Sequence, residues 1–200
     1  MSFQTRLDAI SQQFAAAPDE IKTPIGAAKA KFCESFDRAG AIQIGQKLPH
    51  FRLPDAVGHE GGWCPYCSIA LHEFQSKLDE LRAKGVTLVA ISPELPDNSL
   101  STVEKNQLGY TVLSDLGNQY ARRLGLVFSQ PKSLRPIFEK LGYDLTARNG
   151  DDSFEVPIPA TLLIGHDGIV CKTFINPDYT KRLPVSKALE WIEGLGETNN

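Results

Sequence analysis

Two cysteines three positions apart, Cys64 and Cys67, have the type and spacing best suited to chemistry in this sequence, within the segment GGWCPYC at 61–67. Pro65 follows the first cysteine, and proline is well tolerated at the first position of a helix. The positive end of a helix stabilises a thiolate and lowers its pKa, so that more of it can attack a peroxide or a disulfide at neutral pH. A second thiol three residues on can then close an internal disulfide. The pattern predicts a redox pair.

A long amphipathic helix is predicted to position this pair. Apolar residues recur at three- and four-residue steps from Cys67 to Leu81, polar residues fill the other face, and Gly85 ends the pattern. Cys64 then lies at the start of the helix, and Cys67 lies one turn further on the apolar stripe. We therefore expect Cys64 to be the more exposed of the two sulfurs.

Two other interpretations of the cysteine pair stay open. A C-x-x-C is half of a zinc site, although Cys33 and Cys171 are single and distant, and His72 alone completes such a site poorly. The pair could also be inert core thiols. Cys33 neighbours the apolar stripe of a predicted helix, which favours a small buried thiol over a third redox residue.

Length and composition indicate one ordinary globular domain with an appendage. The 200 residues are 42% hydrophobic and 22% charged, and the net charge is −3. No cluster of lysine and arginine predicts a nucleic-acid or membrane surface. The first residues lack the pattern of a secretory signal, so we expect a cytoplasmic protein. Four cysteines are too few for a disulfide scaffold, which favours a catalytic role for the close pair.

The chain divides into a helical extension at 1–40 and a second unit at 41–196. The extension carries two amphipathic patterns, which start near Phe3 and Pro18. Strands and helices alternate in the second unit, as in β-α-β proteins. Strands are predicted at 86–92, 110–114, 126–128 and, as a hairpin, 160–165 with 169–174; the first is an apolar run typical of a parallel strand covered on both faces. Further helices are predicted at 99–108, 118–124, 132–141 and 184–195, and the polar residues 143–155 are predicted to be loop.

From about Ile44 to Trp191 the sequence resembles the AhpC/TSA family, the peroxiredoxin-like proteins of the thioredoxin superfamily. Five phrases in order carry the resemblance: FRLPDA at 51–56, GGWCPYC at 61–67, LVAISP at 88–93, VLSD at 112–115 and IPATLLI at 158–164. The resemblance implies a thioredoxin-like α/β fold, a mixed sheet flanked by helices, with the N-terminal extension added to it. It also implies that Pro159 is a cis-proline facing the cysteines. Trp63 and Tyr66 either wall the site or cover the core.

The resemblance and the local pattern disagree on which cysteine attacks. Peroxiredoxins carry Thr-x-x-Cys with the peroxidatic cysteine last, which puts Cys67 in that role and Cys64 at the threonine. The helix start and the thioredoxin precedent favour Cys64 instead. Both assignments stay open at the level of sequence.

The sequence departs from its relatives in two respects. A strand and loop of roughly twenty residues before the C-x-x-C are missing, by the usual lengths of such elements. Two arginines that would stabilise a leaving oxygen are replaced by Glu60 and Pro159. Four arginines remain as substitutes, each more typical of a solvated surface charge: Arg122, Arg123, Arg135 and Arg182.

The function that the resemblance implies is a thiol-dependent peroxidase acting on hydrogen peroxide or organic hydroperoxides. A thioredoxin- or glutaredoxin-type reductant would recycle the cysteine pair, and no metal or organic cofactor is needed. Family likeness suggests a homodimer; no nucleic-acid or membrane partner is expected. The alternatives are a thiol–disulfide oxidoreductase without peroxidase activity and an inactive remnant of the fold.

Overall fold

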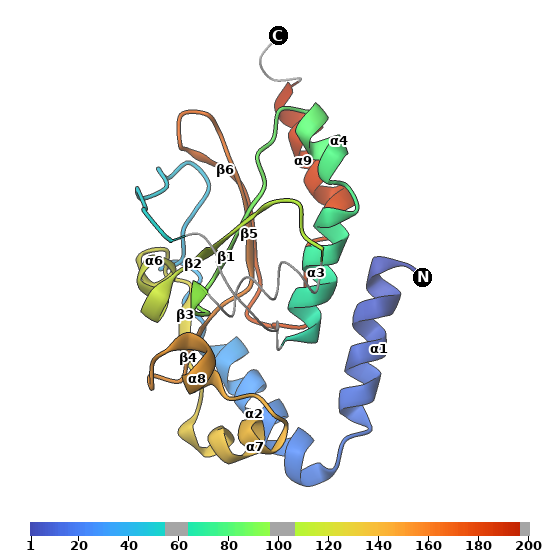
Figure 1. Ribbon diagram of the computed structural model, residues 1–200, viewed down its shortest axis with the longest axis vertical. Coiled ribbons are helices and arrows are strands. Elements are labelled where there is room, and N and C mark those ends of the chain that lie inside the picture. Colours follow the sequence, from blue (N-terminus) through green and yellow to red (C-terminus); the bar gives the residue numbers. More distant parts are fainter. Residues whose placement is uncertain (55–63, 97–106, 197–200) are drawn as a thin grey trace.

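The computed structural model describes residues 1–54, 64–96 and 107–196 (Figure 1). Its α-helices are α1 Phe3–Ala15, α2 Asp19–Ser35, α3 Pro65–Gln75, α4 Leu78–Ala83, α6 Gln119–Arg123, α7 Arg135–Lys140, α8 Leu145–Asn149 and α9 Val185–Gly196. Two short 3-10 helices are η1 Leu116–Asn118 and η2 Lys132–Leu134. The strands are β1 Val89–Ser92, β2 Thr111–Ser114, β3 Val127–Ser129, β4 Glu155–Pro157, β5 Ala160–Ile164 and β6 Val170–Ile175. None of the helices in these ranges is long and apolar enough to cross a bilayer.

The two predicted N-terminal helices are confirmed as α1 and α2. The Ser2 side chain accepts a hydrogen bond from the Thr5 N–H, which satisfies one of the free donors at the start of α1. Pro18 precedes α2, and Asp19 and Glu20 place negative charge in its first turn, where the helix dipole favours it. Figure 1 shows α1 standing beside α3 and α2 lying beside α7.

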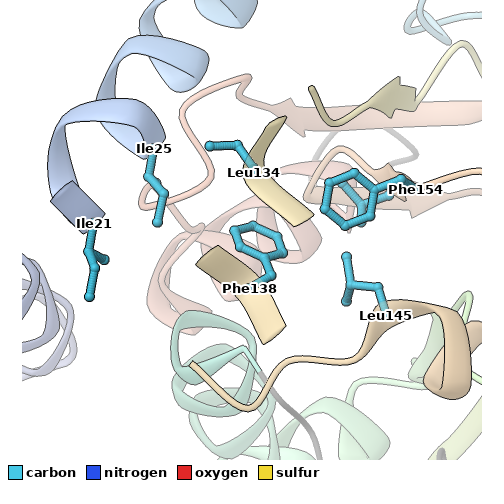
Figure 2. Close-up of a cluster of buried hydrophobic side chains, with 7 residues drawn as sticks. Ile21, Ile25, Leu134, Phe138, Leu145 and Phe154 are labelled. Carbon is cyan, nitrogen blue, oxygen red and sulfur yellow. The ribbon is translucent and has the colours of Figure 1, made fainter. Parts of the chain in front are cut away.

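Helix α2 contributes to the core of the second unit. Ile21 and Ile25, four residues apart on one face, are buried in a cluster with side chains from η2, α7, α8 and β4 (Figure 2). The other buried members are Leu134, Phe138, Leu145, Phe154 and Val156. The apolar face of α2 is thus covered by residues more than a hundred positions away in the sequence.

The predicted helix over 64–85 is interrupted, and in this respect the prediction was wrong. Helix α3 ends at Gln75, Lys77 leaves the helical conformation, and α4 starts at Leu78. The Ser76 hydroxyl donates to the Glu73 carbonyl at 2.7 Å, one of the local bonds by which serine competes with a helix. The interruption lets Leu78 and Leu81 enter two different core clusters, the second of which joins α4 to α9.

The strands form three two-stranded ladders, one parallel and two antiparallel. Strand β1 pairs with β2 in parallel, β3 with β4 and β5 with β6 in antiparallel fashion. The predicted mixture of directions and the β5–β6 hairpin are confirmed, and Gly168 takes the positive φ of 81° that its turn requires. Within the described ranges, no ladder joins these pairs into one continuous sheet.

Two further predictions, one about a strand and one about a loop, were wrong. Val89 and Ile91 of β1 are each 40% exposed, so only one face of this strand is covered, by the cluster that contains Ala90. The polar stretch 143–155, predicted as loop, instead forms α8 and runs into β4. The Asp144 carboxylate accepts a hydrogen bond from the Ala147 N–H and so caps the start of α8.

Two other expectations fall mainly outside the described residues. Residues 55–63, where the missing strand would have ended, are not described, and no strand lies in the described residues 48–54 and 64–88. The helix predicted over 99–108 also lies outside, apart from its last two residues.

The shared core predicts that α2 stabilises the whole chain. Replacing Ile25 with Ala should lower the free energy of unfolding by about 2 to 5 kcal/mol, the usual cost of deleting a buried aliphatic side chain. Urea denaturation followed by far-UV circular dichroism measures this. The exposed Thr23→Ala change on the same helix is the control and should stay within about 0.5 kcal/mol. A change in the free energy of unfolding for Ile25→Ala as small as that for Thr23→Ala would show that α2 is not part of the core.

Candidate functional site

The two cysteines of the C-x-x-C lie at the start of α3. Cys64 is the N-cap residue, with an extended backbone at φ −90° and ψ 109°, and Pro65 occupies the first helical position as predicted. Cys67 is the third helical residue. The expected order of exposure was wrong: Cys67 is exposed and Cys64 is half-buried. The buried position in this turn is taken by Tyr66, which turns Cys67 towards the surface.

Arg182, from the segment between β6 and α9, reaches the sulfur of Cys67. Its Nη2 donates to Cys67 Sγ at 3.4 Å, within the range for hydrogen bonds to sulfur. Nη1 of the same guanidinium donates to the backbone carbonyls of Tyr179 and Lys181, which hold the group in place. Arg182 is thus the one of the four candidate arginines that the structure brings to the cysteines.

The other three candidate arginines have partners elsewhere. Arg122 pairs with Glu155, and Arg135 pairs with Asp152. Arg123 donates to the His50 carbonyl. Glu60, which stands where relatives carry an arginine, lies outside the described residues.

The two thiols have opposite pKa shifts. A hydrogen bond from Cys64 lowers the pKa of Cys67 to about 6; loss of water around the sulfur opposes this, and the Arg182 charge and hydrogen bond add to it. The same hydrogen bond, followed by burial and the negative charge of Cys67, raises the pKa of Cys64 well above its usual range. At neutral pH the site therefore holds a Cys67 thiolate beside a Cys64 thiol.

Tyr66 forms the inner wall of the site and connects it to α1. Its ring is buried, and its hydroxyl lies 3.0 Å from Ser11 Oγ. The Tyr179 ring meets it edge to face, with 5.9 Å between the ring centres. Burial raises the pKa of Tyr179 to about 12, so this phenol stays neutral at neutral pH.

The other residues predicted to wall the site are Trp63 and Pro159. Trp63 lies outside the described residues. Pro159 is half-buried directly before β5, but the expected cis bond was wrong, because every described peptide bond is trans. Trans is the lower-energy form even for proline, by about 0.5–1 kcal/mol.

The remaining two cysteines are not part of the C-x-x-C. Cys33 and Cys171 are half-buried, and burial together with Asp178 raises the pKa of Cys33. Within the described ranges, no three His, Cys, Asp or Glu side chains gather closely enough to hold a metal ion. The described residues therefore offer no zinc site around Cys64 and Cys67.

Sequence reasoning missed the residues that support Arg182 and Tyr66. They are Ser11, Lys29, Asp178 and Tyr179, from α1, α2 and the β6–α9 segment. No periodic pattern marks them. The available signal was the position of Arg182 itself, in a polar connection that follows the hairpin.

Solved structures of similar fold include peroxiredoxins. The peroxiredoxin 6 of Arenicola marina superposes with a TM-score of 0.63 at 17% identity, covering 80% of this chain and 76% of that one. The peroxidoxin BcpB of Mycobacterium tuberculosis gives a TM-score of 0.56 at 16% identity, covering 76% and 97%. At these identities the likeness establishes the thioredoxin-like α/β fold, which confirms the predicted fold class.

The sequence comparisons give the same family. Peroxiredoxin Bcp of Escherichia coli is 26% identical over an alignment 102 residues long, which covers 42% of this chain and 65% of that protein, somewhat less than two thirds of its length. The AhpC/TSA family model matches residues 57–173, well over half of the chain. This span includes both cysteines of the pair and most of the hairpin. The chain belongs to the AhpC/TSA family.

Proposed function

We propose that this protein is a thiol-dependent peroxidase in which the Cys67 thiolate attacks a hydroperoxide. The observation that carries the proposal is the contact between Arg182 and Cys67 Sγ, which puts a positive charge beside the more exposed of the two cysteine residues. A guanidinium in this place stabilises the thiolate before reaction and the negative charge on the leaving oxygen during it. Membership of the AhpC/TSA family supports this assignment.

The reaction runs in three balanced steps. Cys67 Sγ bonds to one peroxide oxygen, the O–O bond breaks, and the other oxygen takes up a proton and leaves as water or an alcohol. Cys67 is then a sulfenic acid. The Cys64 sulfur displaces its hydroxyl, which leaves as water with the Cys64 proton, and a disulfide joins the pair. An external dithiol supplies two electrons and two protons, restores both thiols and itself becomes a disulfide.

The proposed reductant is a thioredoxin- or glutaredoxin-type protein, and the proposed setting is the cytoplasm, where such dithiols keep protein thiols reduced. The exposure of Cys67 supports this, because an external thiolate must reach a sulfur of the disulfide. Hydrogen peroxide and organic hydroperoxides are the proposed substrates. A homodimer is proposed on family likeness alone.

One observation also favours a second function, thiol–disulfide exchange. An exposed thiolate beside a protonated thiol suits attack on a protein or glutathione disulfide as well as on a peroxide. The two functions differ in the bond that Cys67 attacks, O–O in one and S–S in the other. Rapid oxidation by peroxide separates them.

Single cysteine variants should divide the reaction into its steps. In stopped-flow fluorescence of the reduced protein with hydrogen peroxide, Cys67→Ser should abolish the fast signal, because the attacking sulfur is gone. Cys64→Ser should keep the first oxidation and accumulate a sulfenic acid that a dimedone probe labels. Loss of the fast phase in Cys64→Ser alone would reverse the roles, and a silent, folded wild type that reduces glutathione disulfide would favour disulfide exchange.

The peroxide reaction should depend on pH through Cys67. Its lowered pKa means that the thiolate is present above about pH 6 and is lost below it, so the oxidation rate should rise through pH 6 and level off above pH 7. Replacing Arg182 with Met should move this curve to higher pH and slow the reaction at pH 6 roughly tenfold. Arg182→Lys, which keeps the charge, should lie between the two. An unchanged profile in Arg182→Met would remove Arg182 from the site.

A further inference from the structure

Arg182 lies in a segment without helix or strand, so side-chain contacts must hold it in place. Asp178 organises this segment: its Oδ1 accepts from the Thr180 N–H at 3.1 Å and from the Thr180 hydroxyl at 2.7 Å. These bonds form a tight turn immediately before Arg182. Such a turn fixes its own shape, but it does not fix where the turn sits relative to α3.

One contact that anchors the turn to the rest of the chain comes from the N-terminal extension. Lys29 of α2 places its Nζ 3.2 Å from Asp178 Oδ1, and both side chains are about 70% shielded from water, with exposed fractions of 32% and 27%. The same Nζ lies 5.9 Å from the centre of the Tyr179 ring, within range of a cation–π contact. Lys29 thus touches two successive residues of the segment.

Tyr179 extends this chain of contacts to the cysteine pair. Its ring meets Tyr66, the residue directly before Cys67, and its backbone carbonyl accepts from the Arg182 guanidinium. The path from Lys29 to the thiolate is therefore short and continuous. It passes through Asp178 and Tyr179 to Arg182, and from Arg182 Nη2 to Cys67 Sγ.

The charge state of Asp178 is consistent with this arrangement. Burial raises the pKa of Asp178, but the bonds from Thr180 and the charge of Lys29 outweigh it, so the net shift is downward and the carboxylate stays ionised at neutral pH. The half-buried thiol Cys33 also neighbours Asp178 and stays protonated. A shielded carboxylate of this kind depends on its cation, and loss of Lys29 would release it towards water.

We propose that Lys29 is a positioning residue for the reactive thiolate: its ion pair with Asp178 holds the 178–182 segment against α3, and so keeps the Arg182 guanidinium on Cys67. The N-terminal extension would then complete the active site as well as the core. The inference rests on the proposed function only in taking Cys67 as the reactive sulfur.

The test is a thiolate titration of the reduced full chain, in which absorbance at 240 nm is followed against pH. Lys29→Met should raise the apparent pKa of Cys67 by about one unit, which lowers the thiolate fraction at pH 6 from about one half to roughly a tenth. Lys29→Arg should restore the wild-type curve, since it keeps the ion pair. Lys31→Met, an exposed lysine on the same helix, is the matched control and should leave the curve unchanged.

The Asp178→Ala variant distinguishes a loss of Arg182 positioning from the direct electrostatic effect on Cys67 of removing a charge. Removing a negative charge would by itself lower the pKa of Cys67, whereas release of Arg182 would raise it. A raised pKa in both Lys29→Met and Asp178→Ala supports the proposal. A lowered or unchanged pKa in Asp178→Ala overturns it, as does an unchanged pKa in Lys29→Met.

The titration uses no peroxide, so it keeps the two proposals apart. A wild-type thiolate with a pKa near 6 that does not react with peroxide would end the proposed function, and the variants would still decide the role of Lys29. Should Lys29→Met fail to fold, Lys29→Gln takes its place in the titration, because Asp178→Ala also removes the bonds from Thr180.

Discussion

A guanidinium held against one sulfur of a cysteine pair is the interaction on which the proposed chemistry depends. Cys64 and Cys67 share the start of one helix, so the helix dipole alone acts on both of them in the same direction. The charge of Arg182 favours ionisation of both sulfurs, but its hydrogen bond goes to Cys67 and so breaks this symmetry. One thiol then ionises and the other donates a hydrogen bond to it, and each shift reinforces the other. The two residues take different roles although they share the start of one helix.

This dependence explains why the site draws on distant parts of the chain. A guanidinium can reach the sulfur only if the β6–α9 segment lies close to α3, and that segment has no backbone ladder of its own. Side-chain contacts replace the ladder: Lys29 from α2, Tyr66 from α3 and the turn at Asp178. Within the described ranges the strands form only short paired ladders, so helix and side-chain packing carries much of the positional precision.

Local sequence signals predicted local features well. Pro65 at the start of α3, the β5–β6 hairpin and both N-terminal helices were predicted, because turn residues and apolar spacing act over a few residues. The predicted order of exposure of the two cysteines was wrong. It depends on which side of the first turn of α3 packs against the core, and the buried residue in that turn is Tyr66. The role of Arg182 could not be predicted from spacing, because its partner Cys67 lies 115 residues away.

The spacing within α2 shows how core and site are coupled. Ile21, Ile25 and Lys29 follow one another at four-residue steps, so they lie along one face of the helix. The first two enter the buried cluster with α7 and β4, and the third pairs with Asp178 in the segment that carries Arg182. Packing of the isoleucines fixes the rotation of α2, and that rotation aims Lys29 at the segment that carries Arg182. A hydrophobic constraint in the first two turns of the helix therefore sets an electrostatic contact one turn further on, which ties the geometry of the thiolate to the integrity of the core.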